Sequence, residues 1–193
     1  MDRVAAARQL VAHRLGAQAR GIVVTEVEIA GAFGPGWIDV LAFHPESGRL
    51  LVIEIKTEIR DVGRTQRTLA WYESRAVAAA RGLGWNVRGI HGALLVLATA
   101  AVDRDLHENR ELLKTAFPVR STELARFLER PMTAARPSGR SLALIDPLSR
   151  RVQWLRATTL DGRRTPAPHV NYADVIRTLE RRRRQAAPRA PGR

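Results

Sequence analysis

The chain has 193 residues, with 32 lysines and arginines against 19 acidic residues and a formal net charge of +13. This length predicts one domain with a core large enough to fold unaided, and the absence of cysteine excludes disulfide scaffolds, thiolate metal sites and thiol nucleophiles. No apolar run approaches the roughly 20 residues that span a bilayer, and the N-terminus has no signal-peptide core. We therefore expect a cytoplasmic protein without a membrane partner, and the basic charge favours nucleic acid as the partner.

The first half of the chain combines helix and strand patterns. Apolar residues at helical spacing predict a helix over 4–19, and alternating apolar residues predict a strand over 22–29. The glycine-rich segment 31–36 is interpreted as a loop, because the lysine of a phosphate-binding loop does not follow it. Two apolar strands, 37–43 and 49–56, are separated by a turn that contains proline and glycine, so they predict a hairpin.

The second half of the chain predicts more helix than strand. A helix over 64–82, with Trp71 and Tyr72 in the core, precedes a strand centred on 93–98 that is apolar enough to be buried on both faces. The remaining patterns predict helices over 103–115, 121–129 and 172–184, a short strand over 117–119, and a hairpin of 142–145 with 152–155.

The order of these elements predicts an α/β fold, in which helices flank a mixed sheet. We expect a domain over residues 1–130, a C-terminal extension with a hairpin and a helix over 131–180, and a basic disordered tail over 181–193. The arginine run at 181–184 has two interpretations, a phosphate-binding extension or a solvated tail.

Charged residues interrupt the two apolar strands of the hairpin. Asp39 lies within the first strand, and Glu54 and Lys56 lie near the end of the second. Residues two apart share a face of a strand, so Glu54 and Lys56 point the same way, and the hairpin lets Asp39 reach that face. Burying such charges without partners costs several kcal/mol each, which favours a functional cluster. The alternative is an ion pair between Glu54 and Lys56 without a function.

Two carboxylates and an ammonium group are suited to metal-assisted hydrolysis of phosphodiesters. Two carboxylates bind a hard cation such as Mg²⁺ or Mn²⁺, which polarises the phosphoryl oxygen and lowers the pKa of a bound water. A lysine adds a compact positive charge that orients the attacking water or stabilises the developing charge. Lys56 and Lys114 are the two lysines of the chain, and the other basic residues among the 32 are arginines. The choice of lysine at position 56 fits that demand.

Asp39, followed across the hairpin by Glu54, Ile55 and Lys56, resembles the motif of the PD-(D/E)xK nuclease superfamily. Over about residues 2–100, the predicted elements are similar in order to the restriction-endonuclease-like α-β-β-β-α-β core. The resemblance implies that Asp39, Glu54 and the main-chain carbonyl of Ile55 are metal ligands and that Lys56 is the catalytic lysine.

Residues outside the motif complete the expected site. The resemblance implies a supporting role for Gln66, near the start of the next helix. Three arginines after the motif are candidates for phosphate contacts, with a solvated helix face as the alternative: Arg60, Arg64 and Arg67. Many members of the superfamily have a glutamate in the first helix, but this chain has no acid at an inward position there. Glu26 and Glu28 are potential substitutes, so the number of metal ions stays open between one and two.

Two functions from different classes fit the sequence. The first is a metal-dependent nuclease that hydrolyses DNA phosphodiester bonds in restriction, repair or defence. The second is a catalytically inactive nuclease-fold module that binds DNA or serves as the sensing part of a transcriptional regulator. Asp39, Glu54 and Lys56 favour the first, and the missing helix acid favours the second. The sequence leaves open whether the nucleic acid is DNA or RNA, and whether the chain is a monomer or a homodimer.

Overall fold

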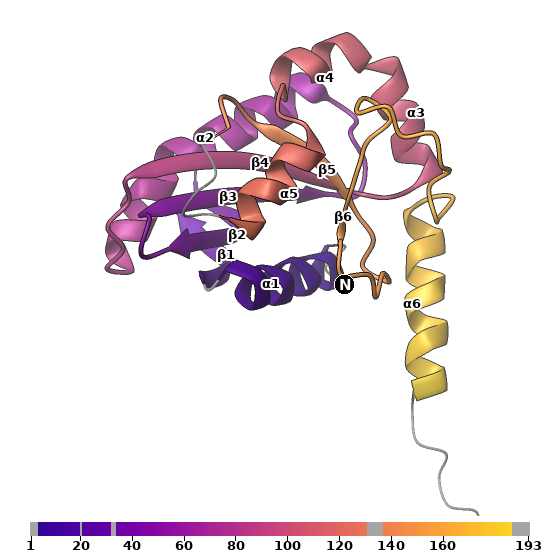
Figure 1. Ribbon diagram of the computed structural model, residues 1–193, viewed down its shortest axis with the longest axis horizontal. Helices are drawn as coiled ribbons and strands as arrows, with labels where there is room; N and C mark the ends of the chain where they lie inside the picture. The colour runs from indigo at the N-terminus through magenta and orange to yellow at the C-terminus, as the bar shows by residue number, and fades with distance from the viewer. Residues whose placement is uncertain (1–3, 20, 32–33, 131–136, 187–193) are drawn as a thin grey trace, which may run out of the picture.

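The computed structural model of the protein describes residues 4–19, 21–31, 34–130 and 137–186. Within them, six strands form one mixed sheet whose spatial order follows their order in the chain (Figure 1). The first three strands are antiparallel neighbours, the third to fifth are parallel, and the sixth is antiparallel to the fifth. The strands are β1 (Ile22–Ile29), β2 (Gly36–His44), β3 (Arg49–Lys56), β4 (Gly89–Leu97), β5 (Ser141–Ile145) and β6 (Leu155–Arg156).

Helices cover both faces of the sheet, and each face has its own apolar core. One core contains side chains of α2, α3 and α4, and the other contains side chains of α1 and α5. None of the described helices is long and apolar enough to cross a membrane. The helices are α1 (Ala5–Ala19), α2 (Val62–Gly82), α3 (Ala100–Glu108), α4 (Arg110–Ala116), α5 (Ser121–Glu129) and α6 (Tyr172–Ala186).

One edge of the sheet contains the ends of three parallel strands. The chain leaves β3 at Lys56 and passes through α2, whose first turn is capped by the Asp61 side chain, and it re-enters the sheet as β4. Because β3, β4 and β5 are parallel, Lys56, Leu97 and Ile145 end their strands at the same edge. We call this edge, defined by these three residues, the carboxyl edge. Loops after parallel strands are the usual place for ligand sites in α/β sheets.

The predicted α/β class, with a mixed sheet flanked by helices, is confirmed. The expected boundary at residue 130 does not divide the sheet, because β5 and β6 continue it. The helix predicted over 103–115 is instead two helices that meet at Asn109, and Val119 forms an isolated bridge to Ser141 in place of a strand. The second strand of the late hairpin is shorter than predicted and begins at Leu155.

The C-terminal helix is longer than the sequence predicted. Arg181–Ala186 continue α6, so the prediction of a disordered tail from residue 181 is wrong for these residues. Residues 187–193 lie outside the described part of the chain. Arginine has a high helix propensity, and positive charge in the last turn is favoured by the helix dipole, so a run of arginines can extend a helix instead of ending it.

Candidate functional site

Strands β2 and β3 separate at Asp39. Their ladder ends at the pair of Val40 and Ile53, and the next pair would be Asp39 with Glu54. At that point the Asp39 carboxylate lies between the strands, and its Oδ2 accepts the Ile55 N–H at 2.8 Å. The N–H and C=O of one strand residue point to the same side, so the Ile55 carbonyl also faces this gap. The gap between the strands therefore contains two oxygen atoms that could bind a cation, one from the Asp39 side chain and one from the Ile55 main chain.

A kink in β1 and β2 accompanies this separation. Ile38 and Val40 are two residues apart and would share a face of a regular strand, yet Ile38 packs in the α2 core and Val40 in the α1 core. Across from Asp39 in the register, Glu26 has a φ of 54°, in the left-handed region that non-glycine residues rarely adopt. Strained backbone of this kind clusters at functional sites, and here it lies opposite the residue whose carboxylate points between β2 and β3.

Glu54 and Lys56 point from β3 toward α2. Leu50 and Val52, on the same face of the strand, pack in the α2 core, so strand alternation places Glu54 and Lys56 on that side. The Lys56 ammonium forms an ion pair with Glu54 Oε1; 39% of the lysine side chain is exposed, against 3% of the glutamate. The site therefore presents an ammonium group to solvent and keeps its carboxylates inside.

Burial dominates the electrostatics of the two carboxylates. It raises the pKa of Glu54 from 4.5 to about 7, with the negative charge of Asp39 as the second cause, and Lys56 offsets only part of this rise. Burial also raises the pKa of Asp39, although the Ile55 N–H and the nearby Arg8 favour its charged form. Both carboxyl groups are therefore hard to ionise in these surroundings. A bound divalent cation would add the positive charge that favours their ionised forms.

Arg8 is a member of the site that the sequence analysis missed. It lies on α1 at 7% exposure, with its Nε 3.3 Å from Asp39 Oδ1 and its Nη1 2.5 Å from Glu26 Oε1. A signal for it was present in the sequence. Arg8 falls between Val4 and Val11 at helical spacing, within the apolar stripe, where a charged residue is expected only with a partner.

Tyr72 also reaches the site from α2. It is buried in the α2 core, as the sequence predicted. Its pKa is raised above the usual range, first by burial and then by the negative charges of Glu54 and Asp39. The phenol therefore stays neutral near the two carboxylates. No feature of the sequence distinguished it from an ordinary core tyrosine.

The other expected site residues lie at the start of α2, next to the carboxyl edge. Gln66 is half-buried and, within the described part of the chain, makes no hydrogen bond to Asp39, Glu54 or Lys56. Arg60, Arg64 and Arg67 are all exposed, and Arg60 pairs with Glu58 at 2.7 Å. These four residues are near the end of β3 in the chain, but the structure joins none of them to the carboxylates by a contact.

The donor set fits one magnesium or manganese ion better than zinc. In the part of the chain that the structure describes, no group of three or more histidine or acidic side chains could hold a metal. Zinc sites use three or four such ligands, whereas Mg²⁺ uses one or two carboxylates and keeps several waters. Asp39, Glu54 and the Ile55 carbonyl provide that smaller set. Arg8 already pairs with one oxygen of the Asp39 carboxylate.

We predict that Glu54 makes the metal-free protein less stable as the pH rises. Its pKa is about 7 in the folded state against 4.5, so the folded state binds more protons between these values. Stability from this group is complete below pH 4.5 and lost as the pH passes about 7, a change on the order of 3 kcal/mol. Glu54→Gln removes this titration. The unfolding free energy is measured by chemical denaturation in chelator-treated buffer at several pH values. Between pH 4.5 and about 7, the value for the variant should rise relative to that of wild type. A difference between the two proteins that does not change with pH would contradict the prediction.

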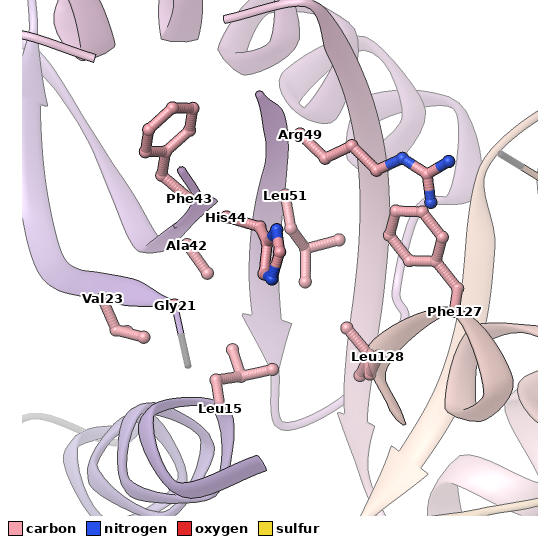
Figure 2. A pocket seen from close by; sticks show the side chains of 10 residues that line it. All are labelled: Leu15, Gly21, Val23, Ala42, Phe43, His44, Arg49, Leu51, Phe127 and Leu128. Atoms are coloured by element: carbon pink, nitrogen blue, oxygen red, sulfur yellow. The ribbon is translucent and has the colours of Figure 1, made fainter. Parts of the chain in front are cut away.

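A pocket at the other end of the sheet is not part of this site. Figure 2 shows it between α1, the strands and α5, lined mainly by apolar side chains, with His44 from the end of β2 and Arg49 from the start of β3. Arg49 and Lys56 are at opposite ends of β3, about 23 Å apart at 3.3 Å per residue. None of the candidate site residues lines this pocket.

No protein-family model matches this chain, and no curated protein matches it.

Proposed function

We propose that the protein is a metal-dependent nuclease that hydrolyses DNA phosphodiester bonds, with a restriction-endonuclease-like core. One observation carries the proposal. The Asp39 carboxylate lies between two separated strands, next to a buried Glu54 that pairs with the partly exposed Lys56. A sequence that only had to fold would not place two carboxylates together in a buried sheet, because each costs several kcal/mol to bury.

Each residue of the site has a role in this reaction. Asp39, Glu54 and the Ile55 carbonyl would bind Mg²⁺ or Mn²⁺. When bound, the cation supplies Lewis acidity toward the phosphoryl oxygen and lowers the pKa of a bound water. The Lys56 ammonium donates hydrogen bonds to the attacking water or to the phosphoryl oxygen, from the side of the site that is open to solvent. The Arg8 guanidinium keeps the Asp39 carboxylate in position through their ion pair.

The distribution of positive charge supports nucleic acid as the substrate. The chain has a formal charge of +13, and three exposed arginines follow the end of β3 at the start of α2: Arg60, Arg64 and Arg67. Contacts from arginine to phosphate position a nucleic acid without reading its sequence. These residues would place a phosphate backbone across the carboxyl edge, within reach of Lys56.

A plasmid-cleavage assay tests the proposal. Supercoiled DNA should become nicked or linear in the presence of Mg²⁺ or Mn²⁺ and stay intact with a chelator. A parallel assay with single-stranded RNA tests the choice of DNA. If the purified protein cleaves neither nucleic acid with either metal, the proposal is wrong.

A second candidate function is a nuclease-fold module that binds DNA without cleaving it, and Arg8 favours it. The guanidinium beside Asp39 adds positive charge next to the expected metal ligands, and this opposes the binding of a cation.

We predict that Arg8→Gln raises the affinity for Mn²⁺, on the order of 10-fold, in titration calorimetry. Arg14→Gln, about 9 Å farther along the same helix, is the matched control and should leave the affinity unchanged. Wild type should bind Mn²⁺ measurably if the protein is a nuclease. Binding that is detectable only in Arg8→Gln would favour the inactive module, and an equal affinity in all three proteins would contradict the role of Arg8.

A further inference from the structure

Helix α6 starts at the carboxyl edge, where the candidate site also lies. Thr99, just after β4, forms an isolated parallel bridge with His169, three residues before α6. The His169 Nε2 lies 3.1 Å from the Oδ1 of Asp146, the residue that follows β5. Lys56 ends the strand next to β4, and neighbouring strands are about 4.8 Å apart. The start of α6 is therefore fixed close to the end of β3.

One side of α6 is attached to the domain. Val175 is the buried residue among the α6 side chains that the structure describes, and Arg182 Nη1 donates to the Leu148 carbonyl at 2.8 Å. These two residues are seven apart, so they lie on the same face of the helix. Beyond this attachment, Figure 1 shows α6 extending away from the sheet.

The opposite side of α6 is basic and exposed. Arg177, Arg181 and Arg184 follow one another at intervals of four and three residues, which places them on one face. That face also contains Glu180, and Asp174 Oδ1 lies 3.6 Å from Arg177 Nη2. The three arginines therefore outnumber the two acidic residues beside them. Like charges at these spacings destabilise a helix, and a bound polyanion would remove this repulsion.

We propose that the arginine face of α6, made of Arg177, Arg181 and Arg184, binds the phosphate backbone of duplex DNA. From Arg177 to Arg184 the helix rises about 10 Å, and phosphates follow at about 3.4 Å along one DNA strand. A length of about 10 Å holds about four consecutive phosphates of one strand, so each of the three arginines has a phosphate within its range. For the choice of DNA over an acidic protein, this inference rests on the proposed function. Helix α6 is then an arm that extends the DNA-binding surface beyond the sheet.

The test is the salt dependence of DNA binding by the full chain, in chelator so that no cleavage takes place. The variant Arg177→Gln/Arg181→Gln/Arg184→Gln should bind a short DNA duplex more weakly, in fluorescence anisotropy, than wild type. The slope of log affinity against log salt should decrease by about three, because each phosphate contact releases counterions. The control variant Arg75→Gln/Arg81→Gln/Arg126→Gln removes the same charge from exposed positions on α2 and α5 and should keep the wild-type slope. Equal thermal midpoints confirm that both variants are folded.

The outcomes separate this inference from the proposed function. If the α6 variant and its control have the same slope, the proposal that α6 binds DNA is wrong, even where plasmid cleavage shows that the protein is a nuclease. If wild type binds DNA through α6 but cleaves neither DNA nor RNA with either metal, the proposal that α6 binds DNA is correct and the nuclease proposal fails. Binding of polyglutamate, instead of DNA, through the same three arginines would overturn the choice of nucleic acid and identify an acidic protein as the partner.

Discussion

Replacing Asp39 with alanine is expected to abolish metal-dependent cleavage of plasmid DNA. The substitution removes one of the proposed metal ligands and leaves the Ile55 N–H without its acceptor. A metal ion stabilises the transition state by several kcal/mol, so cleavage should fall on the order of 10³-fold or more. Binding of duplex DNA in chelator should stay similar or become slightly tighter, because a negative charge is lost near the phosphate backbone.

Asp39→Asn separates the metal ligand from the structural acceptor. Its side-chain carbonyl can still accept the Ile55 N–H, but its charge is gone, so this variant should also lose cleavage while its thermal midpoint stays closer to wild type. Glu111→Gln removes an exposed carboxylate on α4 and should leave the cleavage rate unchanged. If Asp39→Asn cleaves DNA as fast as Glu111→Gln, then Asp39 does not take part in the reaction.

The sequence predicted the parts of the fold that follow from local patterns. The unbroken apolar run of β4, the alternation in β1 and the proline- and glycine-containing turn before β3 each indicate one element, and the structure has all three. The weaker patterns were less accurate. Asn109 divides a predicted helix, and β6 has only two residues, Leu155 and Arg156, because pairing with β5 and not its own pattern defines it.

The candidate site was predictable within the hairpin but not beyond it. Glu54 and Lys56 share a face because they are two residues apart on one strand, and this follows from strand geometry alone. Arg8 reaches Asp39 from a helix on the other face of the sheet, which no local pattern specifies. The left-handed φ of Glu26, which lies opposite Asp39 on the neighbouring strand, is also not indicated by the alternating pattern of β1.

The three-dimensional arrangement changes the interpretation of the motif. On sequence alone, Glu54 and Lys56 could be a simple ion pair, and the structure contains that pair. However, a simple pair would not need Asp39 in the adjacent gap, where its charge and burial together raise the pKa of Glu54 to about 7. Lys56 and Arg8 together face three carboxylates, those of Asp39, Glu54 and the more exposed Glu26, and the remaining negative charge is what a cation site requires.

Lys56→Ala is expected to slow cleavage on the order of 10²–10³-fold, the loss typical of one group that stabilises charge in the transition state. Metal affinity should be largely kept, because Lys56 is not a ligand. Lys56→Arg should not restore the rate, since a planar guanidinium does not fit the place of a compact ammonium.

Lys114→Ala is the matched control for this prediction. It removes the other lysine of the chain, which pairs with Glu111 on the surface of α4 at 3.3 Å. Single-turnover cleavage by the two alanine variants, with Mn²⁺ affinity measured in parallel, separates chemistry from metal binding. If Lys56→Ala cleaves slowly but binds Mn²⁺ with wild-type affinity, the lysine acts in the chemical step. If the lysine acted only through its ion pair with Glu54, the substitution would change the affinity for the cation instead. If Lys56→Ala and Lys114→Ala cleave equally fast, the lysine of the motif has only a structural role as the partner of Glu54.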